Sequence, residues 1–361
     1  LYRYISLYYH YQTINKIELT NLPLTEQERI QPLNSIKTLV NQDVLAETSE
    51  ATLPHIIIRH DGRLDFSMGV GPSTNYLYQQ LTTNMNQIIS VPANSPTTSF
   101  EASTRHNANF DIGENLVLSS YSFTTAIKKL NAIQFFNYEP DEVKFFERGP
   151  NDWVQVITLI KWDGWFIPRP IFGGVIVIEQ IEENTIGNFI SRAAFGKGKF
   201  IKPAEIQNFN YLKNQNLLSD NIATFTAESF RFQNGFSAPL LSHKGDIRVP
   251  YMPEDQNQQP FVTYFNFENI VKDRKGGLYH YFGLEPYNED NKALSTSLFI
   301  PSNGIDENIY YIDHMKNIDS YSGSSSIASK VKEKKKNYDW TANSPAETRP
   351  YVKEINGKRT F

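Results

Sequence analysis

Three carboxylates next to predicted turns or strand ends could act as the acid and base of a hydrolase. They are Asp61, Asp163 and Glu179. In glycoside hydrolysis, two carboxyl groups about 5 to 10 Å apart flank the bond that is cleaved, and an aromatic platform often holds the sugar. The three residues are scattered along the sequence, which does not indicate whether they meet in one cleft. They are the candidate catalytic residues for an enzymatic function.

An acidic turn is the candidate metal site. Glu285, Glu289 and Asp290 lie close together, with asparagines at positions 288 and 291. Carboxylate and amide oxygens are the ligands that calcium prefers, but the turn lacks the residue order of an EF-hand loop. A solvated acidic turn is therefore the favoured interpretation, and a calcium site is the alternative.

Other residue types give little support for catalysis. The histidines form neither an H-x-H nor an H-E-x-x-H motif. Gly235–Pro239 begins like the nucleophile motif G-x-S-x-G, but proline stands where the second glycine should be. The chain has no cysteine, which excludes thiol nucleophiles, disulfides and cysteine-bound metals. We therefore expect no cofactor.

A small basic turn is the candidate membrane contact. Lys197, Lys199 and Lys202 follow one another closely and could bind anionic lipid head groups. The turn does not match the phosphate-binding motif G-x-x-x-x-G-K-[ST]. A solvated basic turn is the alternative.

The composition is that of a globular protein. Of 361 residues, 40% are hydrophobic and 20% are charged. The net charge of −4 gives no global basic field, so we expect no nucleic-acid partner. The absence of cysteine from so long a chain favours a location outside the cytoplasm, in the cell envelope, and compositional drift in an Asn-, Lys- and Ile-rich proteome is the alternative.

The elements that must position these residues are organised around Trp153–Ile181, which holds three of the four tryptophans. Its β-branched, apolar character predicts two long strands of a buried sheet. Asp163-Gly164 predicts a tight turn between them, with Trp162 largely buried. Gly173-Gly174 predicts a bulge in the second strand.

The remaining pattern predicts further hairpins, strands and helices. Asp61-Gly62 and Asn356-Gly357 are each flanked by strand-like sequence, which predicts two hairpins with type I′ turns. Apolar residues at helical spacing predict several short amphipathic helices, over positions 36–44, 77–88, 123–130 and 186–193. Further helices are predicted over 203–212 and 220–232, and strands that carry Phe225, Phe230 and Phe232 are the alternative for the second of these. Alternation predicts strands over 261–267 and 278–282, and a pair formed by 298–300 and 309–312. The predicted class is α+β: a mixed, mostly antiparallel sheet core with short amphipathic helices packed around it.

Four segments are predicted along the chain. They are an N-terminal aromatic and helical arm (1–53), a hairpin-plus-helix unit with a polar linker over 91–109 (54–109), a main α+β core domain (110–316), and a Ser- and Lys-rich solvated tail that begins a C-terminal hairpin (317–361). Leu1–Tyr11 contains five tyrosines, a clustering that resembles the aromatic belt found where a membrane helix leaves the bilayer. The alternative for this stretch is an edge strand or helix end packed on the domain.

The function predicted from these patterns is non-enzymatic. We expect a structural or protein-interaction domain of a larger bacterial envelope protein, anchored in the membrane through segments outside this sequence. The expected partners are other protein subunits, with the membrane surface as a further one. The alternative is a hydrolase or carbohydrate-active domain that uses the scattered carboxylates.

Overall fold

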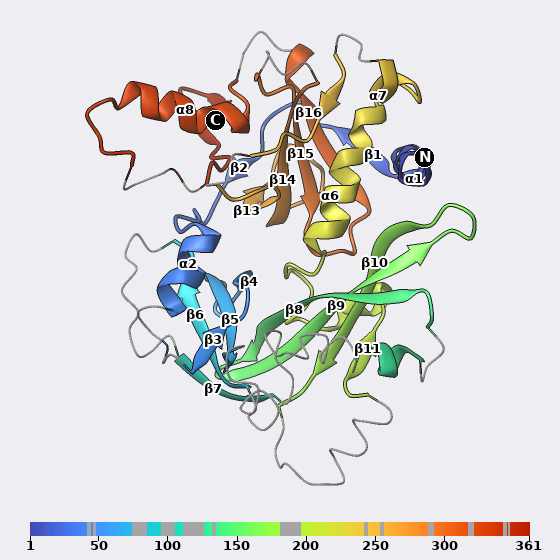
Figure 1. The fold of residues 1–361 in the computed structure, drawn as a ribbon, viewed down its shortest axis with the longest axis vertical. Coiled ribbons are helices and arrows are strands. Elements are labelled where there is room, and N and C mark those ends of the chain that lie inside the picture. The colour runs from blue at the N-terminus through green and yellow to red at the C-terminus, as the bar shows by residue number, and fades with distance from the viewer. Residues whose placement is uncertain are drawn as a thin grey trace.

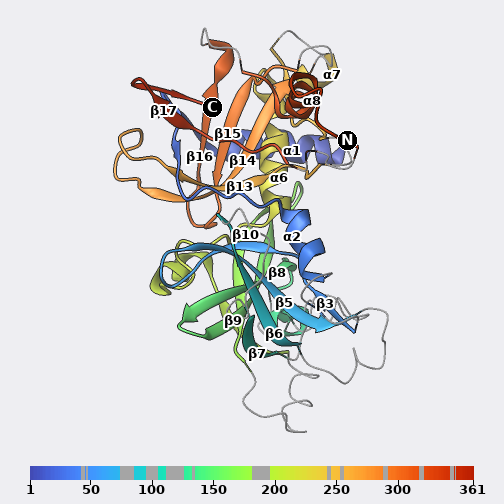
Figure 2. The same ribbon diagram turned by 90° about the vertical axis from the view of Figure 1, so that its left-hand side faces the viewer.

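The computed structural model describes residues 1–41, 45, 48–73, 85–94, 105–110, 126–131, 135–180, 196–241, 245–252, 256–287, 292–316, 321–341, 345 and 347–361. Its sheets are mixed but mostly antiparallel, with a few helices around them, which confirms the predicted α+β class. The seven-stranded sheet and most helices occupy one half of the molecule, and two smaller sheets occupy the other half (Figures 1 and 2).

The seven-stranded sheet combines strands from both ends of the chain. Its order is β1 (Asn15–Glu18), β16 (Asn308–Asp313), β15 (Thr296–Pro301), β14 (Gly276–Pro286), β13 (Phe261–Asn266) and β2 (Leu24–Thr25), with β12 (Ile247–Arg248) also paired to β14. The β1–β16 pair is parallel, and β15 pairs with β16 as predicted. The division into four segments stays a prediction, although this sheet joins strands from the first and third of them.

The predicted central strands are β9 (Asp152–Asp163) and β10 (Arg169–Ile178) of a four-stranded sheet. The other two strands are β8 (Tyr138–Gly149) and β11 (Lys199–Ile201), and the order is β11-β10-β9-β8. The register of β10 against β9 shifts between Phe172 and Gly174, which confirms the predicted bulge. Trp153 is fully buried in the largest apolar cluster of the molecule.

The predicted tight turn and the burial of Trp162 are both wrong. Asp163 pairs with Arg169, so residues 164–168 form a loop instead of continuing the strand. The proline at 168 has no N–H to donate to the ladder, so pairing resumes only at Arg169. Trp162 is 39% exposed, and Trp165 in the loop is 92% exposed.

The third sheet contains β3 (Ser49–Ala51), β4 (His55–Ile58), β5 (Leu64–Pro72), β6 (Met85–Pro92) and β7 (Arg105–Phe110). The predicted hairpin of β4 and β5 is confirmed, and Gly62 has a φ of +86°. The Arg59 N–H donates to the Arg63 carbonyl, so the loop holds three residues between this pair and is not a two-residue type I′ turn.

Two further predictions in this region need correction. The helix predicted over 77–88 fails at Met85 and Ile88, which lie on strand β6, and residues 74–84 are outside the described part. The polar linker over 91–109 overlaps strand β7, in which His106, Ala108 and Phe110 are buried. Because only alternate residues of a strand face the core, a polar sequence can still form a half-buried strand.

The helices are α1 (Tyr2–Thr13), α2 (Leu33–Leu39), α6 (Asp220–Ser229), α7 (Ala238–Leu241) and α8 (Ser324–Lys334), with 3₁₀ turns η3 (Pro203–Asn208), η4 (Phe230–Phe232) and η5 (His314–Lys316). Residues 126–131 are also helical. Helix α6 confirms the prediction for 220–232, and the side chain of Ser219 caps it by accepting from the Ile222 N–H. The helix predicted over 186–193 lies outside the described residues.

The C-terminal segment is more ordered than predicted. Helix α8 occupies the stretch that was expected to be solvated, and it buries Ser324, Ser326 and Ala328. Small side chains allow this close packing. Strands β17 (Lys353–Ile355) and β18 (Lys358–Thr360) form the predicted hairpin, and the positive φ of Asn356 and Gly357 fits a type I′ turn.

The Tyr-rich N-terminal stretch is a packed helix. Helix α1 buries Leu7 and His10 and contacts α6 and η4. The rings of Tyr4 and Tyr8 meet Phe232 and Phe236 edge to face. Among the described helices, none is long and apolar enough to cross a membrane.

Candidate functional site

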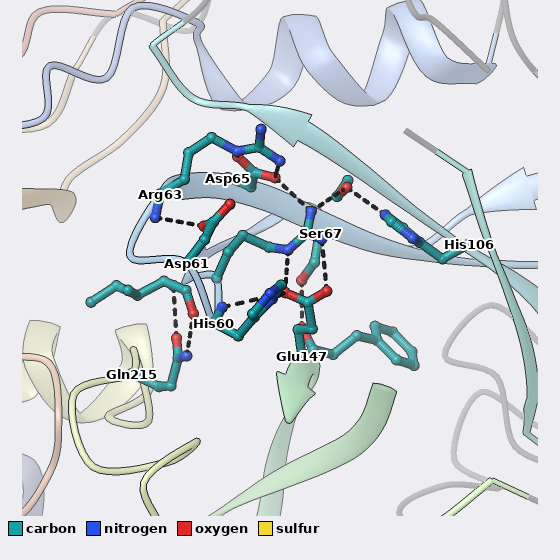
Figure 3. A network of polar contacts seen from close by, with 12 residues as sticks. His60, Asp61, Arg63, Asp65, Ser67, His106, Glu147 and Gln215 are labelled. Atoms are coloured by element: carbon teal, nitrogen blue, oxygen red, sulfur yellow. Dashed lines mark hydrogen bonds and ion pairs between the residues drawn. The ribbon is translucent and has the colours of Figure 1, made fainter. Parts of the chain in front are cut away.

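The densest buried cluster of charged side chains surrounds Arg59, which follows β4 (Figure 3). Its guanidinium binds Glu147 of β8 through two parallel hydrogen bonds, Nε to Oε2 at 2.6 Å and Nη2 to Oε1 at 2.7 Å. Nη1 donates to Asp65 Oδ2 at 2.9 Å and to Ser90 Oγ at 3.0 Å. Bidentate pairs of this kind are among the strongest polar contacts in proteins.

A second layer of contacts surrounds this centre. His60 Nδ1 lies 2.6 Å from Glu147 Oε2, and Arg63 Nε donates to Asp65 Oδ1 at 2.9 Å. Ser90 Oγ is also 2.9 Å from His106 Nε2. Burial raises the pKa of Glu147, but hydrogen bonds from Arg59 and His60 outweigh it and lower this pKa to about 2.

The arrangement favours a structural role for the Arg59 cluster. Arg59, Asp65 and Glu147 are buried, and each charged group has an oppositely charged partner. A nucleophile or a general base would need an unshared lone pair facing a substrate. The cluster instead fastens the β4–β5 hairpin to β8, and so connects the five-stranded sheet to the four-stranded sheet.

The low pKa of Glu147 predicts how the free energy of unfolding depends on pH. Its ordinary value is 4.5 and its folded value is about 2, so the ionised carboxylate stabilises the folded state above pH 4.5. This stabilisation is lost as the pH falls from 4.5 towards 2. We expect the unfolding free energy of the wild type to fall more steeply over that range than that of Glu147→Gln. Urea denaturation at several pH values measures both slopes, and equal slopes would contradict the assignment.

A second cluster resembles a catalytic triad in composition only. Ser302 Oγ lies 2.9 Å from His280 Nδ1, and His280 Nε2 lies 3.1 Å from Asp220 Oδ1. Ser302 and His280 are completely buried, so neither can touch a substrate in this structure. In serine hydrolases the serine contacts Nε2 of the histidine and the aspartate contacts Nδ1, which is the reverse of the arrangement here. The trio instead joins the first turn of α6 to the seven-stranded sheet.

The structure does not bring the three predicted catalytic carboxylates together as the acid and base of a hydrolase. Asp163 binds Arg169, the first residue of β10. Glu179, which directly follows the last residue of β10, binds Arg148. The ten residues of that strand separate them by about 30 Å. Asp61 accepts from the Arg63 N–H within the β4–β5 loop beside the Arg59 cluster.

The predicted metal ligands are only partly described. Glu285 is 3% exposed and accepts hydrogen bonds from the backbone N–H and the hydroxyl of Ser325. Its carboxylate therefore ties α8 to β14. Glu289 and Asp290 lie outside the described residues. In the part of the chain that the structure does describe, no cluster of His, Asp and Glu is placed to hold a metal ion.

Two of the predicted lipid-contacting lysines lie over aromatic rings. The ammonium of Lys199 is 4.9 Å from the centre of the Phe209 ring, and that of Lys202 is 5.6 Å from the centre of the Phe135 ring. Both lysines are exposed, whereas Lys197 is half-buried. Contact of these three side chains with lipid stays a prediction.

An exposed group of aromatic side chains lies where α1 meets the β9–β10 loop. We call Tyr2, Tyr9, Trp165 and Phe166 the aromatic surface; their exposures are 56%, 44%, 92% and 86%. Three contacts hold α1 to this loop and to the start of β10. Ser6 Oγ donates to the Pro168 carbonyl at 2.8 Å, the Arg169 guanidinium lies 5.5 Å from the Tyr9 ring centre, and Arg169 Nη1 donates to Thr13 Oγ1. Figure 1 shows α1 beside that end of β10.

The sequence interpretation missed both the Arg59 cluster and the aromatic surface. A signal for the cluster was present at Asp65, which is the only charged residue of the otherwise apolar strand β5, whereas Glu147 lies on a strand with several other charges and does not stand out. The signal for the surface was Pro168, which has no N–H to donate and so keeps the preceding Trp165 and Phe166 out of the ladder.

Comparison with known proteins adds no relative. No protein-family model matches the sequence, and neither a curated protein nor a solved structure gives a significant match.

Proposed function

We propose that this chain is a non-enzymatic protein-interaction domain that binds another protein subunit through the aromatic surface. The observation that carries the proposal is the exposure of Trp165 and Phe166 on a loop whose C-terminal end is held to α1. Monomeric proteins rarely leave such apolar groups together on the surface without a function. Tryptophan, tyrosine and arginine are also the residues that contribute most to binding in protein interfaces.

The charges around the aromatic surface favour a protein partner over a lipid membrane. Arg169 pairs with Asp163 and Arg3 pairs with Glu228, so positive and negative groups are balanced. Anionic lipid attracts surfaces with an excess of Lys and Arg, which this surface lacks. An apolar centre with a rim of both charges instead suits a partner that offers an apolar pocket and its own charged rim.

We further propose that the domain belongs to a larger protein of the bacterial envelope, anchored in the membrane by segments outside this sequence. Its cysteine-free composition supports a location outside the cytoplasm. A hydrolase or carbohydrate-active enzyme is less well supported, because Asp163 and Glu179 stand at opposite ends of β10.

The double substitution Trp165→Ser/Phe166→Ser tests the proposed surface. Because truncation of a central aromatic contact costs about 2 kcal/mol or more, we expect binding to weaken by at least about 30-fold. The tagged wild-type chain, extracted from its native host, should elute from gel filtration in an assembly larger than one chain. The double variant should elute as the free chain.

A matched control is Tyr338→Ser. Tyr338 is 52% exposed and follows α8, on the opposite side of the molecule from α1 in Figure 1. This variant should elute like the wild type. Elution of the Trp165/Phe166 variant in the unchanged assembly would show that the aromatic surface binds no subunit.

A further inference from the structure

A cavity of about 700 Å³ lies where α1, α6 and η3 meet the four-stranded and seven-stranded sheets. Its walls come from segments far apart in the sequence, from His10 of α1 to Ile309 of β16. The volume is within the range of pockets that bind small molecules. None of its lining residues belongs to the aromatic surface.

Two cationic side chains line the cavity from the ends of β9 and β10. Arg169 donates Nε and Nη2 to Asp163 and Nη1 to Thr13. A guanidinium has five N–H groups, so two remain for a ligand. Lys161 also lines the cavity, and its ammonium forms no ion pair or hydrogen bond with any described residue. The two cations together provide a place for one carboxylate.

His10 has an unused hydrogen-bond acceptor. It is 4% exposed, and its Nε2 lies 3.0 Å from Thr226 Oγ1. The Thr226 hydroxyl gives its proton to the Ile222 carbonyl, so His10 Nε2 must carry the hydrogen of this contact. His10 Nδ1 is therefore a lone-pair acceptor to which no described residue donates, but the atom is enclosed by protein and a ligand in the cavity does not reach it in this structure.

The charge state of His10 agrees with this assignment. Burial lowers the pKa of His10 to about 3, and the nearby cations Arg169 and Lys16 lower it further in the same direction. The ring is neutral at ordinary pH, and Nδ1 can only accept. The acceptor in the lining that a ligand can reach is Glu307, an exposed carboxylate that makes no ion pair with a described residue.

The rest of the lining is largely apolar. Ile171, Phe172, Ile305 and the ring of Tyr138 cover the space between these polar groups. An apolar wall with a few placed polar groups is the usual composition of a small-molecule site. It can hold the C–H face of a sugar ring while the polar groups fix its substituents.

We propose that this cavity binds an acidic sugar, with its carboxylate on Lys161 and Arg169 and its hydroxyls donating to Glu307. A uronic acid carries these groups on one small ring: an anion, several hydroxyl donors and an apolar face. A neutral sugar would leave the Lys161 ammonium without an anionic partner, and an inorganic anion would leave the Glu307 carboxylate without a donor. This binding activity is separate from the proposed protein interaction and does not depend on it.

Isothermal titration calorimetry of the purified chain with sodium glucuronate tests the proposal. We expect saturable binding of glucuronate, and binding at least about 10-fold weaker for glucose, which lacks the carboxylate. Sodium acetate and L-alanine, which lack the ring hydroxyls, should also bind at least about 10-fold more weakly. Equal affinity for glucose and glucuronate would overturn the proposal, as would the absence of any glucuronate heat at about 10 mM or tighter binding of alanine.

Two variants place the ligand in this cavity. Lys161→Ala and Glu307→Gln should each weaken glucuronate binding by about 10-fold, because each removes a charged partner of the ligand. Neither side chain has a partner among the described residues, so both variants should melt like the wild type. Lys199→Ala, an exposed lysine outside the cavity, should bind glucuronate normally. Unchanged affinity in both cavity variants would overturn the proposed site.

Discussion

Replacement of Glu147 by glutamine is expected to lower the free energy of unfolding by about 3 to 5 kcal/mol. The substitution keeps the shape of the side chain but removes the negative charge that faces Arg59. The guanidinium of Arg59 would then stay buried with one of its two carboxylate partners missing. Urea denaturation at neutral pH measures the change directly.

The control for this prediction is an exposed ion pair on the same strands. Arg148 Nε donates to Asp152 Oδ2 at 2.7 Å near the β8–β9 turn, with both side chains well exposed. Asp152→Asn should therefore cost no more than about 1 kcal/mol. A loss for Glu147→Gln that is as small as the loss for Asp152→Asn would show that the Arg59 cluster does not hold the two sheets together.

Replacement of Trp153 by alanine is the second substitution with a large expected effect, about 3 to 5 kcal/mol in the free energy of unfolding. Trp153 is completely buried, the Arg59 guanidinium lies 5.2 Å from its ring centre, and the His106 ring lies 4.9 Å away. Its removal opens a cavity in the largest apolar cluster and uncovers one face of Arg59. Thermal and urea unfolding of the purified variant measure the loss.

Trp165→Ala is the matched control, because this side chain is 92% exposed and packs in no apolar cluster of the described residues. Its unfolding free energy should stay within about 0.5 kcal/mol of the wild type. If Trp153→Ala were equally mild, the four-stranded sheet would not be the centre of the core.

The sequence predicted those parts of the fold that depend on local pattern. Trp153–Trp162 is too apolar and too β-branched for anything but a buried strand, and Asn356-Gly357 requires the positive φ values that the structure has. A helix over 220–232 was predicted from the sequence, and the structure adds the cap at Ser219. In each case the residues that decide the structure lie within a few positions of one another.

The predictions failed where distant residues decide the structure. Trp162 looked like a core residue, but the core closes around Trp153, and Trp162 stands at the open end of the sheet. The polar sequence of β7 forms a strand because β6 pairs with it and buries its alternate residues. Helix α8 is held by Glu285, which is some forty residues earlier in the chain.

The candidate sites follow the same rule. The Arg59 cluster joins residues from four strands, and the charges of Asp65 and Glu147 could be noticed in the sequence but not assigned to each other. The cavity of His10 and Lys161 likewise gathers side chains from α1 and β9. The exposure of Trp165 and Phe166 follows only once the register of Asp163 against Arg169 is known.

The measurement that tests the proposed interaction most directly is photo-crosslinking in the native host, with benzoylphenylalanine in place of Trp165 and, as the control, in place of Tyr338. We expect the probe at 165 to give a covalent adduct with one defined protein, identified by mass spectrometry, and the probe at 338 to give none with that protein. Two results would contradict a protein-binding function for the aromatic surface. One is that the probe at 165 forms adducts with lipid alone, and the other is that no protein is crosslinked more often at 165 than at 338.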